Sequence, residues 1–179
     1  YYGHKNTGRP PDPHAASIPS GTPLDPSGFF SAYLDEDHRP LFPFGFGLGY
    51  TQFEYSDLQL SASQVTPGGT LQASVALRNT GGRAGTEVVQ LYVRDLVGSV
   101  TRPVRELKDF RRVNLEAGES CRVHFELNTD QLAFHDLHCQ RVVEPGRFKL
   151  WIAPSAASGL EAEFELMAPQ AGALTGLNA

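Results

Sequence analysis

From Phe53 onward the chain alternates apolar and polar residues with a period of two. This pattern is typical of β-strands that bury one face and expose the other. Two weaker runs, at residues 53–61 with a phase slip near Ser56 and at residues 107–115, accompany five strong ones. The strong runs lie at residues 71–77, 89–93, 121–127, 148–152 and 160–166. The pattern therefore predicts seven strands.

Turn sequences rich in Gly, Pro and Asn separate these runs at short intervals. They are Pro67-Gly68-Gly69, Asn79-Thr80-Gly81-Gly82, Ala117-Gly118, Pro145-Gly146 and Ala157-Ser158-Gly159. Seven strands over about 115 residues predict an all-β fold, an antiparallel β-sandwich like the immunoglobulin and fibronectin type III domains. A closed barrel is the alternative architecture. One helical turn is expected at residues 129–134, capped by Asn128 or Thr129.

Residues 41–51 read LFPFGFGLGYT and have a different character. Four aromatic residues, Phe42, Phe44, Phe46 and Tyr50, alternate with glycines and one proline. Flexible linkers are poor in aromatic residues, so we interpret this segment as a buried connector rather than a mobile Gly/Pro linker. If the ring of Phe44 is buried, its truncation to Ala is expected to cost about 3–5 kcal/mol.

Residues 1–40 are dense in proline and glycine, which excludes a long helix or a central strand. Such a long irregular lead is unusual within one compact domain, so we expect it to lie on a neighbouring upstream domain. At the other end, residues 169–179 show no periodicity and are expected to be disordered or loosely docked.

Charge and composition limit the classes of binding partner that can be expected. The chain has 15 basic and 20 acidic side chains, a net charge of −5, so neither nucleic acid nor an anionic membrane is an expected partner. No apolar stretch approaches the roughly 20 residues needed to span a bilayer. The two cysteines, Cys121 and Cys139, fall in unrelated positions and are interpreted as free thiols.

The search for catalytic or metal-binding motifs finds little. No CxxC, HExxH, GxSxG, Walker or dinucleotide fingerprint is present, and no cofactor is expected. His135 and His138 are the one close histidine pair, and a polar turn explains them better than a zinc site does. Two carboxylate groups, at residues 35–37 and at positions 161, 163 and 165, are interpreted as exposed surface rather than as a facing catalytic pair.

Two aromatic residues suggest a different class of function. Tyr92 and Trp151 are out of phase with the apolar faces of their strands, which predicts that both lie on the surface. Exposed rings of this kind stack on sugars, so a freestanding module that binds carbohydrate or protein is the rival interpretation.

Five motifs together resemble the C-terminal end of the glycoside hydrolase family 3 β-glucosidases. They are HKNTGRP at 4–10, LFPFGFGLGYTQFEYSDL at 41–58, NTGGRAGTEVVQLYVRD at 79–95, TRPVRELKDFRRVNLEAGES at 101–120 and VEPGRFKLWIA at 143–153. The resemblance implies that residues 1–40 are the end of an α/β sandwich domain and that residues 52–168 form a fibronectin type III-like domain. Residues 41–51 would connect these two domains. The sequence departs from the family at Gly49, Cys121 and Cys139.

The resemblance also implies which parts of the reaction lie elsewhere. Family members hydrolyse β-glucosides, and sometimes xylosides, with retention of configuration. Their Asp nucleophile and Glu acid/base lie in domains upstream of this segment, and neither has a matching position here. The chain is therefore expected to be a non-catalytic module without glycosidase activity of its own, and we assign it no catalytic residue.

The implied partners are the upstream catalytic domains, or a separately encoded catalytic chain that this chain complements. The residues expected at that interface are Phe42, Phe44, Phe46, Tyr50, Arg102 and Arg105, with Arg111 as a further polar contact. His4 and Lys5 are the candidates for the rim of the substrate pocket. The resemblance favours a periplasmic or extracellular location. The spacing of the histidines predicts no bound metal.

Overall fold

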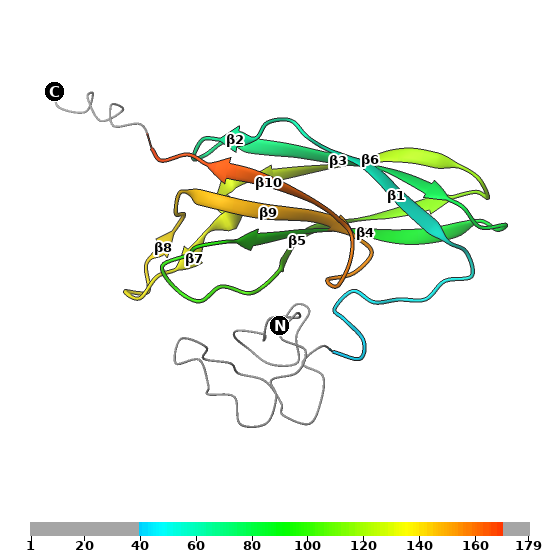
Figure 1. The fold of residues 1–179 in the computed structure, drawn as a ribbon, viewed down its shortest axis with the longest axis horizontal. Helices are drawn as coiled ribbons and strands as arrows, with labels where there is room; N and C mark the ends of the chain where they lie inside the picture. Colours follow the sequence, from blue (N-terminus) through cyan, green and yellow to red (C-terminus); the bar gives the residue numbers. More distant parts are fainter. Residues whose placement is uncertain (1–39, 170–179) are drawn as a thin grey trace, which may run out of the picture.

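Two β-sheets packed face to face form the body of the structure, a computed structural model that describes residues 40–169 (Figure 1). The three-stranded sheet has the order β1-β3-β6, the five-stranded sheet the order β2-β10-β9-β4-β5, and β7 and β8 form a small hairpin. The strands are β1 (Phe53–Leu60), β2 (Gln64–Val65), β3 (Thr70–Asn79), β4 (Gly85–Asp95), β5 (Glu106–Leu115), β6 (Ser120–Asn128), β7 (Phe134–His135), β8 (Arg141–Val142), β9 (Gly146–Ala153) and β10 (Leu160–Leu166), and one 3₁₀-helix, η1 (Thr129–Leu132), follows β6.

All seven predicted strands are present, and the predicted all-β sandwich is confirmed. The phase slip near Ser56 corresponds to an irregularity in the β1–β3 register between Ser56 and Gln59. There Asp57 adopts a positive φ of 51°, and its carboxylate pairs with Arg122 of β6. The slip therefore marks a bulge in β1, which changes the face to which the following side chains point.

Three short strands were missed because two residues are too few to show a period. β2 pairs with β10 in parallel, so the five-stranded sheet is not wholly antiparallel. The predicted helical turn is the 3₁₀-helix η1. Its cap is Asn128, whose side chain accepts a hydrogen bond from Asp130 N (2.8 Å), while the Gln131 side chain accepts one from Asn128 N (2.9 Å).

The core lies between the inner faces of the two sheets, where the alternating apolar residues meet. Cross-strand neighbours there include Val75 opposite Val123 and Leu91 opposite Ile152. Removing each such aliphatic side chain from water contributes roughly 1.5–3 kcal/mol to folding. The most completely buried members are Phe125, Leu71, Leu77, Leu91, Leu127, Leu150, Ile152, Leu166, Val75 and Val89.

Cys121 is half-buried at the margin of this core, Cys139 is exposed, and both thiols are free. Among the described residues no helix is long and apolar enough to cross a membrane. The expected boundaries at residues 1–40 and 169–179 fall on chain that lies almost entirely outside the described residues.

Asn79, at the end of β3, is a fully buried polar side chain that joins several loops. Its Nδ2 donates to Arg83 O (2.7 Å) and Leu115 O (3.0 Å), and its Oδ1 accepts from Thr51 Oγ1 (2.6 Å) and Gly81 N (3.1 Å). A buried amide with these hydrogen bonds fixes where the connector ends, how the β3–β4 turn runs and where β5 ends.

We expect Asn79→Ala to lower the free energy of unfolding by about 2–4 kcal/mol, because it leaves buried donors and acceptors without partners. Urea denaturation of the full chain measures this change. Asn114→Ala is the matched control, since Asn114 makes a single exposed hydrogen bond, to Thr86 Oγ1 (3.1 Å). Equal effects of the two substitutions would contradict the role assigned to Asn79.

Candidate functional site

The connector, residues 41–51, is attached through its backbone carbonyls to the β9–β10 loop and to a side chain of β4, and it runs below the five-stranded sheet in Figure 1. Ala156 N donates to Phe44 O (2.8 Å), and Gln90 Nε2 of β4 donates to Gly45 O (3.3 Å). Gly45 has a φ of +79°, and a Cβ at this position would lie 2.1 Å from Gln90 Oε1. The positive φ favours glycine at this position, and a Cβ there would displace the Gln90 amide from its hydrogen bonds.

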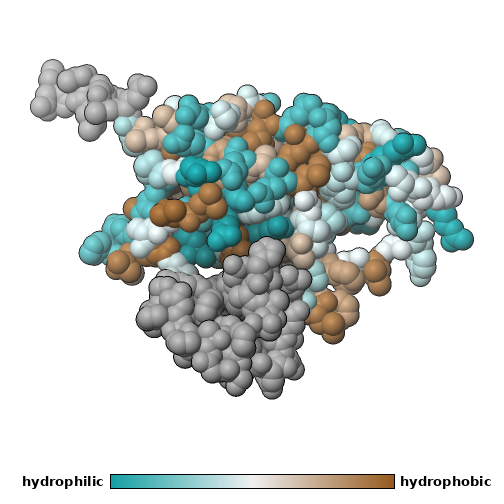
Figure 2. Space-filling view, in the orientation of Figure 1, coloured by the Kyte–Doolittle hydropathy of each residue, from teal (hydrophilic) through white to brown (hydrophobic). Residues whose placement is uncertain are grey.

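The aromatic side chains of the connector are exposed, which contradicts the expectation that they are buried within the chain. The exposed fractions are 66% for Phe42, 48% for Phe44 and 46% for Phe46, and Tyr50 is almost fully exposed. The hydrogen bonds from Ala156 and Gln90 to the connector are accepted by its backbone carbonyls, and such bonds do not require the rings to be buried. The rings of Phe42 and Phe46 lie 5.2 Å apart and contact each other. Figure 2 shows hydrophobic atoms gathered below the sandwich, where Figure 1 places the connector.

This exposure also removes the basis for a large effect of Phe44→Ala. A ring that is half exposed loses little burial when it is truncated, so the expected cost of 3–5 kcal/mol does not hold for the chain alone.

A groove of about 530 Å³ opens between the connector and the outer face of β4 and β5. Phe44, Phe46 and Leu48 contribute from the connector, and Val88 and Phe110 from the two strands. The groove is open to solvent and mostly apolar. We call these five side chains, together with the space between them, the connector groove.

Glu87 is the single carboxylate among the described residues that line the groove. Burial raises the pKa of its carboxyl above the ordinary value, although a hydrogen bond from Val88 N (3.0 Å) acts in the opposite direction. Burial and the nearby charge of Glu87 likewise raise the pKa of Tyr55. Tyr55 comes from β1 of the other sheet, and its buried hydroxyl makes no hydrogen bond with the described residues.

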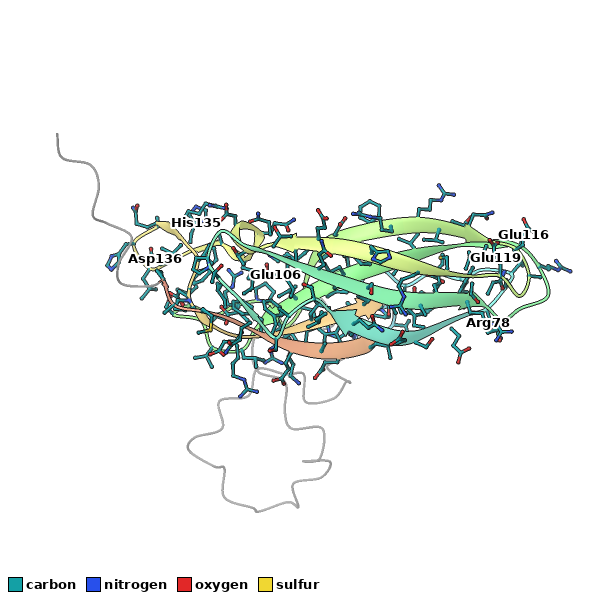
Figure 3. All side chains as sticks on the ribbon, turned by 90° about the horizontal axis from the view of Figure 1, so that it is seen from above. Arg78, Glu106, Glu116, Glu119, His135 and Asp136 are labelled. Atoms are coloured by element: carbon teal, nitrogen blue, oxygen red, sulfur yellow. The ribbon has the colours of Figure 1, made fainter. Side chains whose placement is uncertain are left out.

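Asp95 of β4 and Glu106 of β5 are two carboxylates that line one cavity, but its volume is only about 10 Å³ and Glu106 pairs with Arg102 (2.7 Å) and Lys108 (2.6 Å). A retaining mechanism needs two carboxyl groups about 5 Å apart across the scissile bond. Figure 3 shows Glu106 and Asp136 toward one end of the sandwich and Glu116 and Glu119 at the other. On β10, Glu163 pairs with Arg147 of β9 (2.6 Å) on an exposed face.

The histidine pair lies in a polar turn of the β7–β8 hairpin. Asp136 Oδ1 accepts from His138 N (2.8 Å) and from Gln140 N (2.9 Å), which closes that turn. The described part of the chain contains no group of three or more His, Cys, Asp or Glu side chains placed to hold a metal ion.

Tyr92 and Trp151 are buried, which contradicts the prediction that they lie on the surface. Their exposed fractions are 0% and 5%. The Arg105 guanidinium covers the indole at 4.1 Å from the ring centroid, and Trp151 Nε1 donates to Glu161 Oε2 (2.9 Å). The Tyr92 hydroxyl donates to Gln90 Oε1. Neither ring presents a face on which a sugar would stack, because a second apolar cluster forms on the outer face of the five-stranded sheet.

Arg102 and Arg105, expected at an interface, make contacts within the chain. Arg102 pairs with Glu106 (2.7 Å) and stacks over Phe134 at 4.3 Å from the ring centroid. Arg105 NH1 donates to Ser158 O (2.9 Å) besides covering Trp151. His4 and Lys5, the expected pocket-rim residues, lie outside the described residues.

Sequence reasoning missed Gln90, Val88 and Phe110. Gln90 and Val88 belong to the even positions of β4, which the alternation assigns to the outer face. A polar residue at Gln90, in the middle of the strand VVQLYV, was the one available signal for a specific contact.

Comparison with known proteins places the chain among relatives that are much longer. Residues 87–156 match the family model for a fibronectin type III-like domain. The chain is 38% identical over 167 residues to the periplasmic β-glucosidase of Salmonella typhimurium, covering 93% of this chain and 20% of that protein. It is 48% identical over 121 residues to a β-glucosidase of Bacteroides ovatus, covering 66% of this chain and 16% of that protein.

Among solved structures, a β-glucosidase from Listeria innocua superposes with a TM-score of 0.81 at 34% sequence identity. The match covers 94% of this chain and 22% of that one. The chain thus spans about a fifth of the length of the proteins it resembles.

We expect Glu87→Gln to raise the free energy of unfolding near neutral pH, because burial penalises the charged carboxylate and the amide carries no charge. The folded-state pKa lies above the unfolded-state value of about 4.3, so the penalty is absent below that pH and grows as the pH rises through the folded-state pKa. Urea denaturation at about pH 7 and about pH 3.5, on either side of the carboxyl titration, measures the difference. Glu54→Gln, at an exposed position of β1, is the control, and a gain from Glu87→Gln that is independent of pH contradicts the assignment.

Trp151 is the sole tryptophan, so its fluorescence reports on the cover provided by Arg105. We expect Arg105→Ala to shift the emission to longer wavelength and to increase quenching by acrylamide, because the indole becomes accessible to water. Arg78→Ala, at an exposed position on the other sheet, should leave both unchanged. An unaltered spectrum in Arg105→Ala is inconsistent with the observed stacking.

Proposed function

The chain belongs to glycoside hydrolase family 3 as a C-terminal segment containing a fibronectin type III-like domain, and from this we propose that it is the non-catalytic structural module of a retaining β-glucosidase. In this proposal residues 1–40 end an α/β sandwich domain, 41–51 form the connector and 52–168 form the module. The upstream catalytic domains hydrolyse terminal β-glucosidic bonds, and this segment stabilises them.

The exposed apolar side chains of the connector carry the proposal. Phe42, Phe44 and Phe46 leave large aromatic surfaces in water, although they lie on a segment whose backbone is fixed. Exposed apolar surface gathered in one place is typical of a contact with another protein surface. The connector leads toward the part of the polypeptide that precedes Pro40, which is where the relatives carry most of their length.

The small cavity beside Asp95 and Glu106, and the pairing of Glu106 with Arg102 and Lys108, fit this division of labour. The module holds its own core and its own outer-face cluster, so it needs no partner to form a sandwich. We propose that a preformed module with a docked connector restricts the orientation of the domains before it. His4 and Lys5 remain our candidates for the rim of their substrate pocket.

The rival interpretation, a freestanding sugar-binding module, depended on two exposed aromatic side chains, and both are buried. Tyr92 and Trp151 are covered by Gln90, Glu161 and Arg105 rather than open to a ligand. A subunit that complements a separately encoded catalytic chain uses the same surfaces, and co-purification with such a chain distinguishes it from a segment of one polypeptide.

We expect deletion of residues 52–179 from the complete enzyme to lower both its unfolding temperature and its rate of nitrophenyl glucoside hydrolysis. The reason is that the deletion exposes to water the surface that the module covers. Differential scanning calorimetry and the hydrolysis assay measure the two effects. Deletion of residues 170–179 alone is the control, and an enzyme unchanged by the longer deletion refutes the proposed function.

A further inference from the structure

We propose that the connector groove is the docking site for the domain that precedes the connector, and that it receives an apolar surface carrying a carboxylate at its margin. This inference rests on the proposed function and adds to it the face of the module, the residues and the chemistry of the partner. Three features of the described residues support it: the side chain that builds the groove, the exposed apolar side chains around it, and one unpaired charge at its margin.

Gln90 builds the groove by holding the connector across the sheet. Its side chain is buried and donates to Gly45 O (3.3 Å) and to Pro154 O (2.6 Å). Its Oε1 accepts from the Tyr92 hydroxyl, which fixes the orientation of the amide. The outer face of β4 and β5 therefore forms one wall of the groove, and the connector, which does not belong to the sheet, forms the other. The groove is a built feature and not a chance gap between loops.

Exposed apolar surface is concentrated at this groove. Within residues 40–169, eight of the eleven large hydrophobic side chains that are exposed belong to the connector or to the adjoining faces of β4 and β5. They are Leu41, Phe42, Phe44, Phe46, Leu48, Tyr50, Val88 and Phe110. Elsewhere on this face, Tyr92 of β4 packs with Trp151 and Ala153 of β9 in a buried apolar cluster, so the exposed positions of β4 and β5 mark one limited area.

Arg112 supplies the charge at the margin. It is the cross-strand neighbour of Val88 in the β4–β5 register, and side chains at directly opposed positions project to the same face of a sheet. The Arg112 side chain is exposed and makes no hydrogen bond or ion pair with the other described residues. Its neighbour Arg111, by contrast, pairs with Asp109 (2.7 Å). A guanidinium that is free beside an apolar patch fits a partner carboxylate.

The occupant we commit to is the upstream domain, because of chain connectivity. One wall of the groove is the connector itself, which is the segment that joins the module to the polypeptide before it. In the relatives about four-fifths of the length lies outside the region that this chain matches. Two other occupants, a second copy of the chain and residues 1–39 of the same chain, are separated from it by the experiment.

The experiment places one charge in the groove and one at a matched distant position. Phe110→Asp alters a side chain that is 58% exposed in the groove, and Leu137→Asp alters one that is 82% exposed in the β7–β8 hairpin. Each is introduced into the complete enzyme and into the 179-residue chain, and unfolding temperatures are measured by calorimetry. Phe110→Asp is expected to lower the unfolding temperature of the complete enzyme by about 3 °C or more. The 179-residue chain and both Leu137→Asp proteins should stay unchanged.

A charge reversal tests the margin separately. Arg112→Glu is expected to destabilise the complete enzyme and not the 179-residue chain, with a loss that decreases at high salt because the interaction is electrostatic. Arg78→Glu, which alters an exposed arginine on the outer face of the other sheet, is the control and should have no effect on either protein.

Three results overturn the inference. If Phe110→Asp destabilises the 179-residue chain but not a chain that starts at residue 40, residues 1–39 occupy the groove. If the 179-residue chain is a dimer that Phe110→Asp dissociates, a second copy occupies it. If the complete enzyme tolerates Phe110→Asp and yet is destabilised by deletion of residues 52–179, the module docks through another face and the proposed function stands.

Discussion

Two buried side-chain amides hold the connector to the sandwich, and the arrangement of the whole described chain depends on them. Asn79 accepts a hydrogen bond from the Thr51 hydroxyl at the end of the connector, and Gln90 donates to Gly45 O near its middle. A buried amide that lacks its partners is costly, so each of these contacts constrains the segment that it meets. The connector is consequently part of the folded body, although it belongs to neither sheet.

This attachment explains how a segment can have a fixed path and exposed rings at the same time. The backbone carbonyls of Phe44 and Gly45 accept hydrogen bonds from Ala156 N and Gln90 Nε2, while the Phe44 and Phe46 side chains line the groove and keep nearly half of their surface exposed. The outer face of the five-stranded sheet is accordingly divided. One part is closed by Tyr92, Trp151 and the Arg105 guanidinium, and the other is left as an open apolar groove beside Val88 and Phe110.

The sequence predicts the sandwich well because a strand with one solvent-exposed face alternates apolar and polar residues with a period of two. This pattern located all seven long strands and even the bulge near Ser56, where the alternation changes phase. It could not show two-residue strands such as β2. Alternation also assigned Tyr92 and Trp151 correctly to the outer face, but it does not report whether a long side chain such as Arg105 covers that face. The exposure of the connector rings was missed for a related reason, since composition indicates a preference for burial and not which surface provides it.

Gly45 has a practical consequence for recombining modules between related enzymes. With its positive φ and no room for a Cβ beside Gln90, the connector fits the sheet of its own module and is not interchangeable as a generic spacer. A chimera joined inside residues 41–51 would combine part of the connector from one parent with the sheet that it contacts from another. Crossover points are therefore better placed upstream of Pro40, so that the connector and that sheet come from the same parent.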